Sequence, residues 1–162
     1  MRVLTLSAAA ISALSVIGFT DLAQAQQKLF VYADMERGNQ AGAPPACVLN
    51  NVFLHLEKVV WRVRVQDQTG KVLDDKGLKS VIVEIQDGQK LEARFGGHPP
   101  RQPTDYLWAA AWIIPANYPT GTFEYKLVVT DQQGNTQTWE PFKVATSQLR
   151  ILDGAIELKK TN

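Results

Sequence analysis

The chain has 162 residues, and 17 Lys and Arg side chains against 16 Asp and Glu side chains leave a formal net charge of +1 at pH 7. This near-neutral balance argues against an electrostatic nucleic-acid binder. The length suits one domain of moderate size, which buries roughly two-thirds of its unfolded surface and needs neither metal nor disulfide to fold. A single cysteine, Cys47, excludes an internal disulfide bond.

The first residues have the pattern of an export signal. Arg2 supplies a positive charge, residues 3–19 are apolar or small, and Ala23-Gln24-Ala25 matches an A-x-A cleavage site. A transmembrane anchor is the alternative, but the run is short and rich in Ala and Ser. We therefore expect residues 1–25 to be a cleaved signal peptide, and the product to be periplasmic or secreted.

The next segment predicts one strand and one loop. Residues 28–35, KLFVYADM, are a short strand candidate, whereas residues 36–46, ERGNQAGAPPA, have no periodicity and are rich in Gly and Pro. We expect residues 26–47 to form an N-terminal strand tethered to the main body by a flexible loop.

Residues 47–95 predict four strands. A first strand within 47–56 is followed by 59–67, in which Val59, Trp61, Val63 and Val65 alternate with Val60, Arg62, Arg64 and Gln66. A third strand spans 78–86, and Asp87-Gly88 is a strong hairpin signal that returns the chain along 90–95.

The stretch 96–103, GGHPPRQP, predicts a long exposed loop, because its three prolines lack backbone donors and its glycine pair breaks regularity. The strand that follows, 106–114, has apolar residues on both faces. Its core face therefore comprises one of two sets: Leu107, Ala109, Ala111 and Ile113, or Trp108, Ala110, Trp112 and Ile114.

The clearest signal is a hairpin over residues 118–144. Alternating apolar side chains predict a strand with one buried face, which continues into a tight reversal at 131–135 and a second strand over 136–144. Residues 147–158 predict an additional edge strand, and 159–162 a polar tail.

Strands about ten residues apart with turn signals between them are typical of an all-β sandwich. Residues 53–144 resemble bacterial immunoglobulin-like and fibronectin type III-like domains. The resemblance is carried by VVWRVRVQDQTGKVL, KSVIVEIQDG and IIPANYPTGTFEYKLVVTDQQGN. It implies an immunoglobulin-like antiparallel β-sandwich of about seven strands plus the N-terminal strand, with the sandwich over 48–158. The paired cysteines of antibody domains are missing, and the fold alone does not define a function.

In immunoglobulin-like sandwiches the strands 59–67 and 106–114 are usually neighbours. With Leu107 inward, Trp108 and Trp112 would lie beside Arg62 and Arg64 on an open face, a favourable cation–π arrangement. With Trp108 inward, both tryptophans fill the core instead. The partner face we expect joins this surface to the loop: Trp108, Trp112, Arg62, Arg64, His98 and Arg101.

A metal site is the alternative use of these residues. Met35, Cys47, His55 and His98 have the thioether, thiolate and imidazole groups that suit copper, although their spacing matches no cupredoxin pattern. A Cys47, His98 and Asp105 set for nucleophilic catalysis lacks any recognisable nucleophile motif.

We therefore expect a non-catalytic exported accessory module, without a cofactor, that docks a periplasmic protein partner through the GGHPPRQP loop and the Trp/Arg face. The alternatives are a periplasmic copper-binding domain and a carbohydrate-binding module that uses Trp108 and Trp112. The partner's identity and the oligomeric state stay open.

Overall fold

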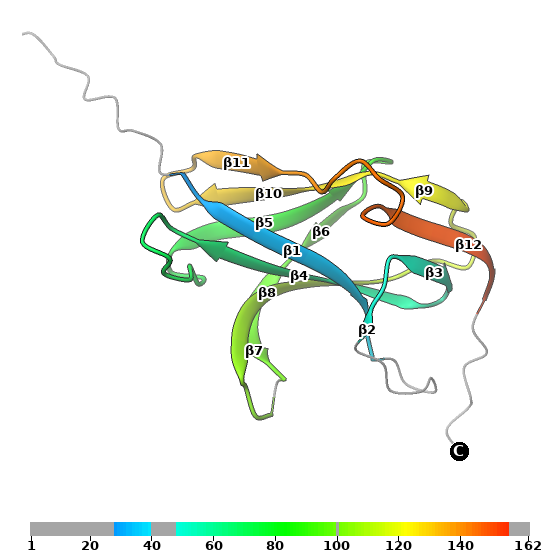
Figure 1. Ribbon diagram of the computed structural model, residues 1–162, viewed down its shortest axis with the longest axis horizontal. Coiled ribbons are helices and arrows are strands. Elements are labelled where there is room, and N and C mark those ends of the chain that lie inside the picture. Colours follow the sequence, from blue (N-terminus) through cyan, green and yellow to red (C-terminus); the bar gives the residue numbers. More distant parts are fainter. Residues whose placement is uncertain (1–27, 40–47, 100, 156–162) are drawn as a thin grey trace, which may run out of the picture.

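A computed structural model describes residues 28–39, 48–99 and 101–155 (Figure 1). The predictions for the signal peptide, for Cys47 and for the tail 159–162 lie outside these described residues. Within them the chain forms strands and no helix. In chain order these are β1 (Phe30–Arg37), β2 (Val48–Leu49), β3 (Val52–His55), β4 (Lys58–Gln66), β5 (Leu78–Ile85), β6 (Lys90–Glu92), β7 (Arg94–His98), β8 (Asp105–Ile113), β9 (Gly121–Phe123), β10 (Tyr125–Asp131), β11 (Thr136–Trp139) and β12 (Leu149–Ala155).

The strands form three sheets. A five-stranded sheet has the order β2-β1-β4-β8-β7, a four-stranded sheet has the order β11-β10-β5-β6, and a small sheet has the order β3-β12-β9. All pairs are antiparallel except β3 with β12. The expected all-β class with antiparallel sheets, consistent with a β-sandwich, is confirmed.

The hydrophobic core lies between the two larger sheets, which Figure 1 shows as two layers. Alternating residues of β4, β5 and β10 point into it and are almost completely buried, as their apolar/polar alternation predicts. Across the layers, the rings of Trp61 and Tyr125 meet edge-on with centroids 5.9 Å apart. This contact joins β4 of one sheet to the first residue of β10 in the other.

Strands β4 and β8 are neighbours, as expected, and their register settles which face of β8 is buried. Trp108 pairs with Val63, and Trp112 pairs with Val59. Because both valines are completely buried, the even-numbered residues of β8 share the core face.

The structure corrects the prediction that no strand forms at Gly96-Gly97-His98. These residues belong to β7, which pairs with β8 and is the edge strand of the five-stranded sheet. Glycine is required at position 97, because a Cβ atom there would lie 2.5 Å from Cγ of Pro103. Pro99 and Pro103 lie outside β7 and β8 and so cost no strand hydrogen bond.

Two more predictions need correction. Strand β12 is not at an edge, because it lies between β3 and β9. The strand expected through Phe123 and Tyr125 is divided at Glu124: Phe123 of β9 pairs with β12, whereas Tyr125 of β10 pairs with β5. The second hairpin strand ends at Trp139, shortly before Pro141, which supplies no backbone donor.

Candidate interaction surface

The hairpin formed by β7 and β8 projects from the two packed layers (Figure 1). Its tip is held by contacts within itself. The backbone N–H of Thr104 donates to the carbonyl oxygen of His98 at 3.1 Å, and Pro103 packs directly on Gly97. The tip is therefore a compact turn, and it places Arg101 and Tyr106 in solvent.

A row of aromatic rings runs from the core out along this hairpin. The ring of Phe95 lies against buried Trp108 at a centroid distance of 5.6 Å. On its other side Phe95 stacks on Tyr106 at 6.2 Å, with 24° between the ring planes. Tyr106 is 54% exposed, so the row ends in an anchored ring that faces water.

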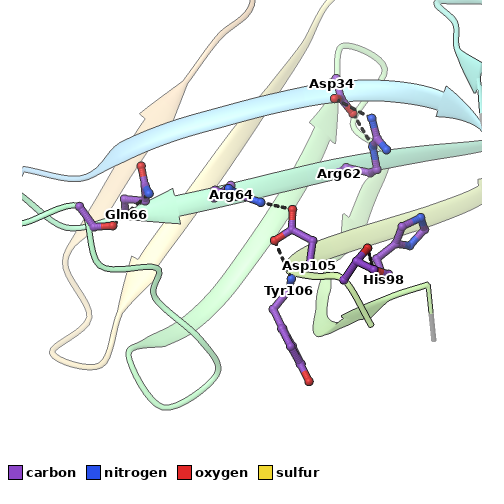
Figure 2. A network of polar contacts seen from close by, with 9 residues as sticks. Asp34, Arg62, Arg64, Gln66, His98, Asp105 and Tyr106 are labelled. Atoms are coloured by element: carbon purple, nitrogen blue, oxygen red, sulfur yellow. Dashed lines mark hydrogen bonds and ion pairs between the residues drawn. The ribbon is translucent and has the colours of Figure 1, made fainter. Parts of the chain in front are cut away.

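An ion pair ties the tip end of the hairpin to the neighbouring strand. Arg64 of β4 pairs with the carboxylate of Asp105, the first residue of β8 (Figure 2). The same carboxylate accepts a hydrogen bond of 2.8 Å from the backbone N–H of Tyr106. The orientation of the hairpin is thus tied to the sheet that carries it.

Arg62, two residues earlier on β4, has a different environment. Its guanidinium makes a bidentate contact with Asp34 at 2.8 and 2.9 Å. It also lies 3.1 Å from a carboxylate oxygen of Glu36, outside hydrogen-bonding geometry. Glu36 is only 2% exposed, so Arg62 neutralises a buried charge.

The prediction that the tryptophans share an open face with Arg62 and Arg64 is wrong. Trp108 is 4% exposed, and its indole N–H donates to the carbonyl oxygen of Leu73 at 2.9 Å. Trp112 is half-buried, and its ring meets that of Tyr118 edge-on at 4.8 Å. Both rings lie on the core side of β8, opposite the arginines, because burial of large aromatic surface outweighs the weak cation–π contact available outside.

Three of the four predicted metal ligands are described, and two of them, Met35 and His55, have the environments of structural residues. Met35 is buried in the core. The two ring nitrogens of His55 lie 3.0 Å and 2.8 Å from the carbonyl oxygens of Gly154 and Tyr118, so both already have partners. Within the three described ranges, no group of three or more His, Cys, Asp or Glu side chains is arranged to hold a metal ion.

The sequence reasoning placed His98 and Arg101 in a loop, and the structure brings both to the projecting hairpin. It missed Tyr106. A signal for Tyr106 was present: if Trp108 faces the core, the residue two positions earlier shares its side of the strand at the point where the strand leaves the sandwich.

Comparison with protein-family models, with curated proteins and with solved structures found no match. In the described ranges there is no helix long and apolar enough to cross a membrane. The sheet topology alone therefore defines the class of this protein: it is an all-β protein whose two larger antiparallel sheets face each other.

Proposed function

We propose that this protein is a non-catalytic, exported binding module of the immunoglobulin-like type that docks a protein partner through the β7–β8 hairpin. The observation that carries the proposal is the projecting, self-braced tip that presents Tyr106 and Arg101. Two facing antiparallel sheets and the resemblance of residues 53–144 support the immunoglobulin-like assignment. The signal pattern in residues 1–25 supports a partner outside the cytoplasm.

The chemistry of the tip suits a protein interface. Tyrosine and arginine are enriched among the residues that contribute most to protein–protein affinity. Each adds a large contact area together with a polar end. His98 adds a half-buried imidazole at the end of β7.

The rigidity of the tip favours binding as well. Ordering a flexible side chain or loop at an interface costs about 0.5–1.5 kcal/mol per side chain. Here the ring of Tyr106 is held by Phe95, and its backbone is held by Asp105. Much of that ordering is therefore complete before the partner arrives.

This proposal narrows the expected partner face. Trp108 and Trp112 are not part of the proposed partner face, because their rings are directed to the core side of β8. Arg64 acts on the hairpin indirectly, through its ion pair with Asp105. His98 and Arg101 remain, and Tyr106 supplies the aromatic contact that the tryptophans were expected to make.

Site-specific photo-crosslinking in living cells tests the proposal. A benzophenone amino acid at position 101 or 106 should give one discrete adduct in the exported fraction. The matched control is position 138, an exposed site on β11 in the other large sheet. Tyr106→Ala should abolish the adduct formed from position 101. Equal adducts from position 138, or none from positions 101 and 106, would contradict docking through the hairpin.

A further inference from the structure

A polar cleft lies on the outer face of the five-stranded sheet, beside the first residues of β8. Its volume is about 490 Å³, and strands β1, β4 and β8 line it. The side chains that give it its character are Tyr32, Asp34, Arg62, Arg64, Gln66 and Asp105. Figure 2 shows all of these except Tyr32, gathered on one side of the sheet.

The strand register explains why these groups meet. Tyr32 of β1 is directly opposite Arg64 of β4, and Asp34 is opposite Arg62. Asp105 reaches Arg64 from β8, on the other side of β4. Three strands thus contribute polar groups to one face, and on β1 and β4 these groups are two residues apart.

The charges of the side chains that line the cleft cancel, and the buried carboxylate of Glu36 beside Arg62 is not part of the lining. Two carboxylates and two guanidinium groups are joined as the pairs Asp34–Arg62 and Arg64–Asp105. The balance selects neither an anion nor a cation. It leaves hydrogen-bond donors and acceptors side by side, since a guanidinium has five N–H groups and a carboxylate about four acceptor sites. A hydroxyl group, which donates and accepts at once, is the ligand group that fits this arrangement.

An exposed aromatic surface borders the polar groups. Tyr32 is 58% exposed and Phe30, two residues earlier on the same face of β1, is 44% exposed. Exposed apolar surface rimmed by polar groups is typical of ligand-binding grooves. Such a ring offers a flat apolar face, which matches the C–H face of a pyranose ring.

We propose that this cleft binds a neutral glycan. Tyr32 stacks on one sugar ring, the carboxylates of Asp34 and Asp105 accept hydrogen bonds from its hydroxyl groups, and Arg64 donates to hydroxyl oxygens. This site is separate from the hairpin tip that we assign to the protein partner. It also differs from the expected carbohydrate surface, because neither Trp108 nor Trp112 is part of it.

An NMR titration of the ¹⁵N-labelled protein tests the assignment. The probes are maltohexaose, cellohexaose and chitohexaose, which are uncharged, and hexagalacturonate, which is anionic. We expect at least one uncharged probe to shift amide signals around Tyr32 and Arg64 in a saturable way. No saturable shift with any of the three, or tighter binding of hexagalacturonate, would overturn the proposal.

Two tyrosine variants locate the site. Tyr32→Ala should weaken binding of the active probe at least tenfold, and Tyr32→Phe should retain it. Tyr106→Ala is the matched control, because the two tyrosines are similarly exposed and only Tyr32 lines the cleft. Equal weakening by the Tyr32→Ala and Tyr106→Ala variants would refute the site, and the spectrum of each variant reports whether it is folded.

The two proposals fail separately. Loss of the crosslinked adduct in Tyr106→Ala with unchanged glycan binding supports both sites. A protein that binds glycan but forms no adduct from the hairpin refutes protein docking alone, and the reverse result refutes the glycan site alone.

Discussion

Truncating Trp108 to alanine should destabilise the fold, and the size of the loss follows from its environment. The side chain is 4% exposed and packs beside Val63 and Phe95. Loss of a buried Trp or Phe side chain typically costs about 3–5 kcal/mol, because the cavity collapses only partly. The substitution also removes the indole N–H that donates to the carbonyl oxygen of Leu73. Leaving this half-buried oxygen without a donor adds about 1 kcal/mol to the loss of stability.

A loss of that size is a large share of the 5–15 kcal/mol typical for a domain. Urea unfolding followed by circular dichroism measures it directly. Trp108→Phe should cost less, because most of the apolar volume remains. Trp112→Ala is the comparison, and its half-buried ring should cost about 1–3 kcal/mol. A Trp108→Ala variant that loses under about 1 kcal/mol, or no more than Trp112→Ala, would refute the burial argument.

Three further predictions follow from buried polar groups. Arg62→Met should lower the free energy of unfolding by about 3–5 kcal/mol, measured with urea, since Glu36 then stays buried without its counter-charge. Arg64→Met is the control and should lower it by at most about 1 kcal/mol. Equal losses of stability in the two variants would contradict this reasoning. Burial, and to a lesser extent a neighbouring carboxylate, raises the pKa of Tyr125 from 10.0 to about 12. The stability gained from its neutral phenol is therefore complete below pH 10 and falls by about 2–3 kcal/mol as the pH rises through 12. Tyr125→Phe should flatten that fall in alkaline unfolding curves, and an unchanged fall would assign it to other groups. His55→Leu should cost about 1–3 kcal/mol, because the imidazole N–H that donates to one of the two neighbouring backbone carbonyl oxygens is lost, and thermal unfolding measures the loss. A midpoint within error of the wild type would show that these contacts are dispensable.

Local patterns predicted the parts of the fold that local physics decides. The alternation along β4 and β10 marks one buried face, whatever lies opposite. The reversal between β10 and β11 is decided in the same way, because Gly134 takes a φ of +91°, which favours glycine, and Asp131 accepts hydrogen bonds from Asn135.

Non-local pairing decided what those patterns left open. Both faces of β8 are apolar, so only its register beside Val59 and Val63 selects the tryptophan face as the buried one. The same holds for Gly96 and Gly97, whose local preference is against a strand but whose pairing with β8 prevails. The parallel contact of β12 with β3 joins residues about a hundred positions apart, which no local signal reveals.

The candidate sites were predicted only in part, for a related reason. Large aromatic residues are usually buried, so the sequence pattern gives no reason to treat Tyr32 and Tyr106 as surface residues rather than as ordinary strand residues. Whether such a ring is exposed depends on what covers that part of the sheet. Figure 1 shows β7 and β8 extending past the two layers, and the side chains of Tyr32 and Tyr106 are both more than half exposed.

The two arginines of β4 show how one sequence pattern conceals two roles. Arg62 neutralises the carboxylate of Glu36, which is almost completely buried. Its contribution to stability is therefore enough to explain why an arginine stands at this position. Arg64 and Asp105 have side chains 39% and 50% exposed, and an exposed pair of this kind stabilises a fold by at most about 1 kcal/mol. The small contribution of this pair to stability therefore does not explain why an arginine stands at position 64. The location of Arg64 accounts for its presence better, since the Arg64–Asp105 pair lines the polar cleft and also holds the tip end of the hairpin against β4. A variant that exchanges the two charges, with Arg64→Asp and Asp105→Arg together, should therefore keep the stability of the wild type while it weakens glycan binding.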